Sequence, residues 1–86
     1  MVKISGGNGT SYENAIVITD CSHFEGVDQE YVELKKRFGN YKLIRQSLLE
    51  HNGKNYDLLE IQLENGIKKL VYFDVSEFYG KGFDFK

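Results

Sequence analysis

The stretch Tyr41–Phe78, YKLIRQSLLEHNGKNYDLLEIQLENGIKKLVYFDVSEF, decides the fold of this 86-residue chain. Two Asn-Gly pairs, Asn52-Gly53 and Asn65-Gly66, each lie between runs rich in leucine, isoleucine, valine and tyrosine. Asparagine and glycine tolerate the positive φ angles of a two-residue type I′ turn, so the pattern predicts two consecutive β-hairpins. We expect three antiparallel strands joined as a meander: Tyr41–His51, Lys54–Glu64 and Ile67–Phe78.

Two-residue turns also predict which residues lie opposite each other across the strands. The first turn is expected to pair His51 with Lys54 and, further along, Arg45 with Glu60. A slip of one residue would place Arg45 opposite an apolar side chain, so the charge pair favours this register. In the second hairpin the same rule places Asp57 opposite Asp74.

The predicted pair of Asp57 and Asp74 needs a physical reason, because like charges directly opposite each other destabilise a sheet. A bound cation, a shared proton or a nearby basic side chain would supply one. The alternative is that both carboxylates bind local backbone N–H groups where the strands end. We therefore retain the two aspartates as a candidate metal site.

The predicted register gives the meander two apolar faces. One face collects Leu43, Leu49, Tyr56, Leu58, Val71, Phe73 and Val75. The other collects Ile44, Leu48, Leu59, Ile61, Leu63, Leu70 and Tyr72. One helix can cover only one of these faces, so the second is expected to contact another part of this chain or another protein.

The first half of the chain predicts one strand and one helix. The β-branched run Ala15–Thr19 is typical of a buried strand, and Asp20–Glu25 is expected to be a loop. From Gly26 or Val27 to Phe38 the apolar spacing changes to that of a helix, and Gly39 is the expected stop. The apolar stripe of this helix consists of Val27, Tyr31, Leu34 and Phe38.

The expected fold is therefore α+β, with the order βαβββ. One helix packs on a mostly antiparallel four-stranded sheet that ends in the three-stranded meander. Residues 1–11 are expected to be a flexible Gly-rich arm, residues 12–80 a single α+β domain, and residues 81–86 an aromatic tail.

Composition narrows the classes of function. A formal net charge of −2 argues against a nucleic-acid binder, which usually carries a basic patch. No apolar run approaches the roughly 20 residues of a membrane helix, and the start lacks the apolar segment of a signal peptide. A single cysteine, Cys21, fits a reducing compartment, so we expect a cytoplasmic protein. Nothing in the sequence predicts a cofactor.

A set of short segments resembles small uncharacterised bacterial and phage proteins of similar length. These segments are Gly9–Ile18, Gly26-Val27, Glu30-Tyr31, Gln46-Ser47-Leu48 and Tyr72–Val75, followed by Phe78 and Gly80. The resemblance implies a complete, free-standing bacterial or phage protein. It implies no activity, ligand or catalytic residue.

The sequence best fits a non-catalytic binding protein that acts through protein–protein contacts, as inhibitors, immunity proteins and anti-defence proteins do, or through homodimerisation. The partner is then another protein or an identical subunit. Aromatic and apolar residues of the meander and tail are the expected interface: Tyr56, Leu58, Tyr72, Phe73, Tyr79, Phe83 and Phe85. No nucleophile or oxyanion site accompanies the carboxylates, so we do not expect an enzyme.

The alternative function is capture of a small phosphorylated ligand or nucleotide, bound within one chain or between subunits. Consecutive glycines can aim backbone N–H groups at an anion. The candidate ligand-binding residues are Gly7, Gly9, Thr10, Ser11 and Tyr12. The segment lacks the preceding strand, the lysine and the following helix of a P-loop, so a mobile arm is the competing interpretation.

Overall fold

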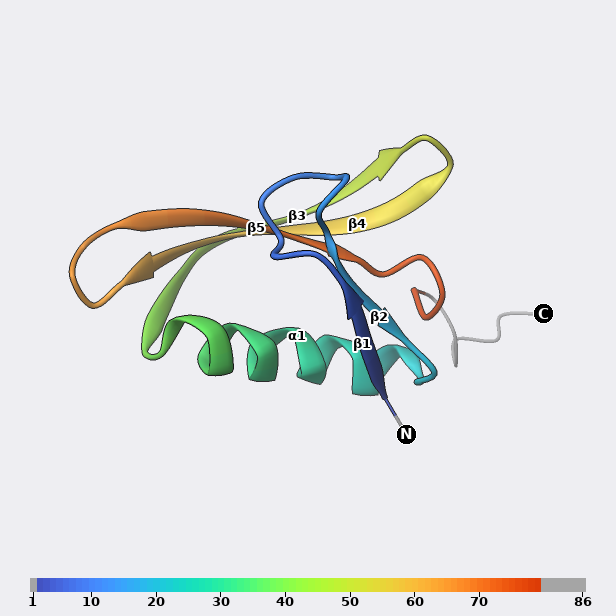
Figure 1. Ribbon diagram of the computed structural model, residues 1–86, viewed down its shortest axis with the longest axis horizontal. Coiled ribbons are helices and arrows are strands. Elements are labelled where there is room, and N and C mark those ends of the chain that lie inside the picture. Colours follow the sequence, from blue (N-terminus) through green and yellow to red (C-terminus); the bar gives the residue numbers. More distant parts are fainter. Residues whose placement is uncertain (1, 80–86) are drawn as a thin grey trace.

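The computed structural model describes residues 2–79. These residues form a single mixed β-sheet with one helix packed against one of its faces (Figure 1). The elements are β1 (Lys3–Gly6), β2 (Ile16–Thr19), α1 (His23–Phe38), β3 (Tyr41–His51), β4 (Lys54–Leu63) and β5 (Lys68–Asp74). The strand order is β1-β2-β5-β4-β3, and β2 and β5 are parallel while the other neighbours are antiparallel. The α+β class and the C-terminal meander are confirmed. The prediction of four strands is wrong, because the sheet has five.

The additional strand, β1, lies within the segment that was expected to be a flexible arm. Its four residues pair antiparallel with β2, from Lys3 opposite Thr19 to Gly6 opposite Ile16. Lys-Ile-Ser-Gly is too short to display a strand periodicity of its own. Pairing with the buried strand β2 supplies the hydrogen bonds that make it a strand.

The first turn of the meander forms as predicted. His51 lies opposite Lys54, and Arg45 lies opposite Glu60. Asn52 and Gly53 both have positive φ angles, 52° and 78°, as a type I′ turn requires. A β-bulge between Leu43 and Arg45 then shifts the pairing of the far end of β3 by one residue.

The second turn differs from the prediction. Leu63 N–H donates to the Ile67 carbonyl at 2.8 Å, and Gly66 N–H donates to the Leu63 carbonyl at 2.9 Å. Gly66 has a φ of 87°, whereas Asn65 does not have a positive φ. The loop is therefore the three-residue kind, Glu64-Asn65-Gly66, in which a type I turn ends in a left-handed glycine. One extra loop residue moves β5 by one position.

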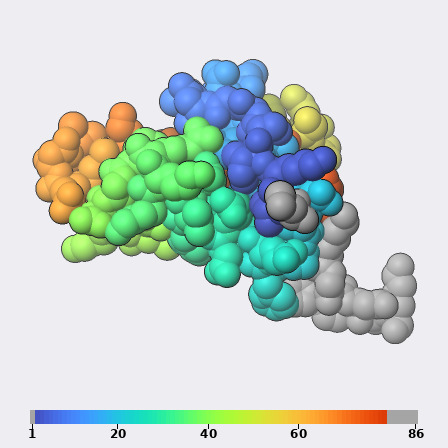
Figure 2. Space-filling model, turned by 60° about the horizontal axis from the view of Figure 1, so that its bottom comes forward, coloured from blue at the N-terminus to red at the C-terminus, as the bar shows by residue number. Residues whose placement is uncertain are grey.

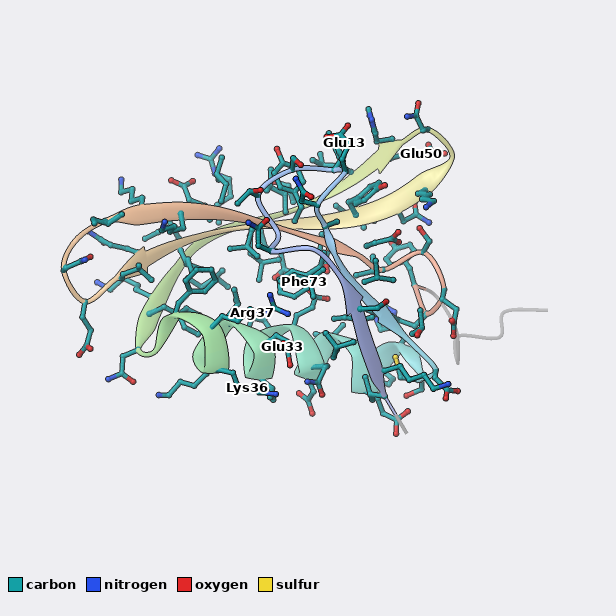
Figure 3. The ribbon with its side chains drawn as sticks, viewed as in Figure 1. Glu13, Glu33, Lys36, Arg37, Glu50 and Phe73 are labelled. Carbon is teal, nitrogen blue, oxygen red and sulfur yellow. The ribbon has the colours of Figure 1, made fainter. Side chains whose placement is uncertain are left out.

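That shift exchanges the two faces of β5. Asp57 lies opposite Phe73, not opposite Asp74, and Leu58 lies opposite Tyr72. The face toward α1 carries the apolar core, where Phe73 points at the helix (Figure 3). The buried cluster consists of Ile16, Ile18, Leu34, Leu59, Ile61, Val71, Phe73, Val75 and Phe78.

We call the opposite side of the meander the open face. It carries Arg45, Ser47, Leu49, Tyr56, Leu58, Glu60, Leu70 and Tyr72.

Helix α1 begins at His23, three residues before the earliest predicted start. Ser22 and Glu25 form a capping box: Ser22 Oγ accepts from Glu25 N–H at 3.3 Å, and Ser22 N–H donates to Glu25 Oε1 at 2.8 Å. The helix runs along one side of the molecule with β1 beside it, as Figure 2 shows. No helix among residues 2–79 is long and apolar enough to cross a membrane.

Candidate functional site

The loop between β1 and β2 folds over one end of the open face, on the side away from the helix (Figure 1). Gly7 N–H donates to the Ala15 carbonyl at 3.0 Å, and Tyr72 N–H of β5 donates to the Gly9 carbonyl at 2.7 Å. Gly9 is buried, and a Cβ there would come within 2.8 Å of Val71 Cγ1. Close packing and hydrogen bonds therefore hold this loop against β5.

The same bonds bear on the candidate ligand-binding residues. Gly7, Gly9, Thr10, Ser11 and Tyr12 do lie in one loop, but the N–H groups of Gly7, Gly9 and Thr10 have internal partners. Gly9 N–H donates to the Asn14 carbonyl at 2.6 Å, and Thr10 N–H donates to Asn8 Oδ1 at 3.2 Å. A phosphate group would have to displace these acceptors before the loop could hold it.

Tyr12 lies at the centre of an aromatic cluster on the open face. Its ring stacks on His51 with centroids 3.9 Å apart, and it meets the rings of Tyr56 and Tyr72 edge-on, each at 4.9 Å. Tyr56 is only 6% exposed under this cover. The cluster closes the end of the open face that lies nearest the β3–β4 turn.

The rest of the open face is not covered in this way. Leu70 is 53% exposed, and Leu49, Leu58 and Tyr72 are half-buried. A shallow depression of about 370 Å³ is lined by Arg45, Ser47, Leu58, Glu60 and Leu70. Apolar and charged side chains thus surround a hollow that could receive one side chain of another molecule.

The predicted interface residues are distributed over several environments. Leu58 and Tyr72 lie on the open face, whereas Tyr56 is covered by Tyr12. Phe73 is fully buried in the core, because the register shift turned it toward the helix. Tyr79 is 46% exposed after β5. Phe83 and Phe85 lie outside the described residues.

The candidate metal pair does not form, since Asp57 and Asp74 project from opposite faces of the sheet. Asp74 Oδ1 accepts from Ser76 N–H at 3.0 Å, and its Oδ2 lies 3.8 Å from Lys54 Nζ. Asp57 Oδ2 accepts from Gln46 Nε2 at 3.4 Å on the helix side. Residues 2–79 contain no group of three or more His, Cys, Asp or Glu side chains that could hold a metal ion.

Asp57 instead faces another carboxyl, that of Glu30 on α1. Glu30 is 0% exposed, and neither of its oxygens meets a hydrogen-bond donor among the described residues. Burial, a hydrogen bond with Asp57 and the charge of Asp57 raise the pKa of Glu30 to about 10. Two carboxyls can share a hydrogen bond only when one carries the proton, and the raised pKa makes Glu30 the one that can donate to Asp57.

Gln46 and Tyr31 extend this polar contact between helix and sheet. Tyr31 Oη donates to Gln46 Oε1 at 3.0 Å, and the Gln46 amide in turn donates to Asp57. The network joins α1 to β3 and β4 beneath the open face. Its acid, Glu30, is closed to solvent, so the pair has no access for a substrate.

Glu33, on the same helix, has the hydrogen-bond donors that Glu30 lacks. Its Oε1 accepts from Arg37 Nε at 3.1 Å (Figure 3). Its Oε2 accepts from Gln29 Nε2 at 3.1 Å. Burial raises the pKa of Glu33, but the bonds from Arg37 and Gln29 and the charge of Lys36 outweigh it and lower the pKa overall. At neutral pH the buried Glu30 is therefore uncharged, whereas the buried Glu33 is negatively charged.

Reasoning from the sequence did not identify Glu30. A signal was present, because Glu30 lies three residues after Val27 and four before Leu34, within the apolar stripe of the helix. A charged residue in that stripe must either reach solvent or find a buried partner. Its partner, Asp57, could be identified only from the correct register.

Comparisons of the chain with protein-family models, with curated proteins and with solved structures found no match. The functional interpretation therefore depends on the geometry described above. Two features carry it: the open face with its depression, and the free edge of β3.

Proposed function

We propose that this chain is a non-catalytic binding protein whose open face contacts another protein. The observation that carries the proposal is the exposure of Leu70 beside a depression that Leu58 also lines. Apolar side chains grouped around a hollow gain free energy when a partner removes them from water, about 1.5–3 kcal/mol for each large residue fully buried. An inhibitor, an immunity protein or an anti-defence protein would use such a face.

The lining of the depression defines the chemistry of the partner. Leu58 and Leu70 fit an apolar anchor side chain, while Arg45 and Glu60 offer one charge of each sign at its border. A partner that inserts an apolar residue next to a hydrogen-bonding group would satisfy both parts of the lining. The Tyr12 cluster bounds the face at one end.

A photo-crosslinking amino acid in place of Leu70 tests this function. Expressed in its native cells, the protein should form a covalent adduct with a specific protein, and the adduct should disappear when Leu58→Asp is added. The matched control carries the crosslinker in place of Val32, which is 48% exposed on α1. Adducts that are the same at both positions, or none at position 70, would contradict the proposal.

The alternative, capture of a phosphorylated ligand, makes a different prediction. A nucleotide that raised the melting temperature of the wild type but not of a Tyr12→Ala variant would favour the loop between β1 and β2 as the site. The internal bonds of Gly7, Gly9 and Thr10 support the protein-binding proposal over this one.

A further inference from the structure

Strand β3 forms one edge of the sheet and is unusually long for that position. It has 11 residues and, among residues 2–79, pairs only with β4, whereas the opposite edge strand, β1, has four. A free edge presents a row of backbone N–H and C=O groups that can pair with another strand. Natural proteins usually shorten, interrupt or cover such an edge.

The backbone of this edge is interrupted at one end only. The bulge between Leu43 and Arg45 interrupts it there, and the sequence contains no proline. From Arg45 to His51 the strand pairs with β4 without interruption over seven residues. That regular segment can accept another strand along its whole length.

Exposed apolar side chains accompany the free backbone. Leu48 is 44% exposed on the helix side of β3, and Ile44 is 41% exposed at the bulge. Leu49 is half-buried on the open face. An added strand would therefore gain apolar contacts on both faces as well as backbone hydrogen bonds.

We propose that a second copy of this chain occupies the edge, with its β3 antiparallel to the first. A two-fold axis through Leu48 places Leu48 opposite the partner subunit's Leu48. It also places Ser47 opposite the partner subunit's Leu49, and Gln46 opposite the partner subunit's Glu50. An amide beside a carboxylate and leucine beside leucine are favourable pairs, and each non-axial pair occurs twice.

Two alternative axes on the same strand are worse. An axis through Glu50 would oppose two carboxylates, and an axis through Gln46 would bring the bulged residue Ile44 into the ladder. The axis through Leu48 instead pairs only the regular segment, Arg45–His51, with its copy. This match between the symmetry and the regular segment favours a second copy over an unrelated strand.

The dimer would join two sheets edge to edge, with the two-fold axis perpendicular to both sheets. Both open faces then lie on the same side, so a partner with two sites would be held by both. The inference does not rest on the proposed function, since it is argued from the free backbone edge of β3, although Arg45 and Ser47 of that strand also line the depression.

Cysteine crosslinking tests the dimer and its register. In a Cys21→Ser background, Leu48→Cys should form a disulfide-linked dimer under mild oxidation, because directly opposed residues have Cα atoms within disulfide range. Ser47→Cys and Leu49→Cys chains should link when mixed, and each more slowly alone. Leu70→Cys, on the open face, is the control. Crosslinking of Leu48→Cys no faster than that of the control would overturn the proposal.

Sedimentation of the unmodified chain gives an independent test. We expect a concentration-dependent dimer whose Kd rises about 100-fold in Leu48→Lys, as two lysines replace two leucines at the axis. Leu48→Gln, a milder change, should weaken it in the same direction. A wild-type chain that remains monomeric at millimolar concentration would refute the dimer. So would a dimer that Leu70→Lys disrupts and Leu48→Lys does not.

Discussion

Glu30 of α1 and Asp57 of β4 face each other between the helix and the sheet, two carboxyl groups that a single proton allows to hydrogen-bond. The raised pKa of Glu30, about 10, arises mainly from burial. Asp57 also accepts from Gln46, so the helix-side carboxyl network links α1 to both β3 and β4. The stability of the helix–sheet contact should therefore depend on pH.

The first prediction is that the protein becomes less stable as pH rises from about 4.5 toward 10. Folded Glu30 stays protonated over this range, while unfolded Glu30, with its ordinary pKa of 4.5, loses its proton. The stabilisation from this group is complete below the unfolded pKa and is lost as pH rises toward the folded pKa. The slope for one proton is at most about 1.4 kcal/mol per pH unit, measured as the free energy of unfolding in urea.

Glu30→Gln is the control for this pH dependence, because other groups also titrate. The amide has the same shape and can donate to Asp57, but it cannot ionise. The difference between wild type and Glu30→Gln should grow in favour of the mutant as pH rises. Parallel curves for the two proteins from pH 5 to pH 9 would show that Glu30 ionises normally in the folded state.

The second prediction concerns Gly26, which lies inside α1 against Phe78. A Cβ at this position would lie 2.5 Å from the Phe78 ring. In an exposed helix, glycine to alanine stabilises by roughly 1 kcal/mol. Here the overpacking, typically about 1–3 kcal/mol, should exceed that gain, so Gly26→Ala is expected to lower the melting temperature.

Phe78→Leu provides the matched background for that test. With a smaller side chain facing α1, the added methyl group has room, and the helix propensity of alanine becomes the larger effect. Gly26→Ala should then be neutral or stabilising, with a coupling energy of at least about 0.5 kcal/mol between the two changes. An equal cost in both backgrounds would mean that the contact with Phe78 does not restrict Gly26.

The third prediction separates the two Asn-Gly turns. Asn52 has a φ of 52°, a backbone conformation that glycine adopts without steric cost. Asn52→Gly should therefore leave the free energy of unfolding nearly unchanged. Asn65 lacks a positive φ, and its Oδ1 accepts from Ile67 N–H at 3.0 Å. Asn65→Gly should therefore cost about 1 kcal/mol through backbone entropy and the lost bond. Equal effects in chemical denaturation would contradict the difference between the loops.

Those two turns also mark the limit of prediction from the sequence. The first Asn-Gly turn and its register as far as the pair of Arg45 and Glu60 were predicted correctly, whereas the β-bulge beyond Arg45 was not predicted. The second Asn-Gly is compatible with two loop lengths, and the local residues do not choose between them. One warning was present: the predicted register opposed Asp57 to Asp74, and the true register removes that repulsion.

Other differences have similarly local causes. Ser22 and Glu25 stand three residues apart as a capping box requires, so the true start of α1 could have been predicted. Strand β1 could not, because its pairing with β2 depends on a return loop held by contacts to β5. The sequence predicts a second apolar face on the meander, but which residues of β5 lie on it depends on the second turn. In the structure Leu70 and Tyr72 lie on the open face in place of the predicted Val71 and Phe73.

The last prediction uses that exchange, since Tyr72 and Phe73 are neighbours on β5 with opposite surroundings. Phe73 is 0% exposed, so Phe73→Asp would bury a carboxylate without a partner and should abolish the folded state. Tyr72 lies on the open face beside Tyr12, so Tyr72→Asp should lose the ring contact and remain folded, at a cost of about 1–2 kcal/mol. Circular dichroism and amide NMR dispersion would distinguish the two variants. With the fold intact, Tyr72→Asp should also reduce the yield of the adduct formed by a crosslinker in place of Leu70. A Tyr72→Asp protein that unfolds as completely as Phe73→Asp would mean that this part of the open face belongs to the core.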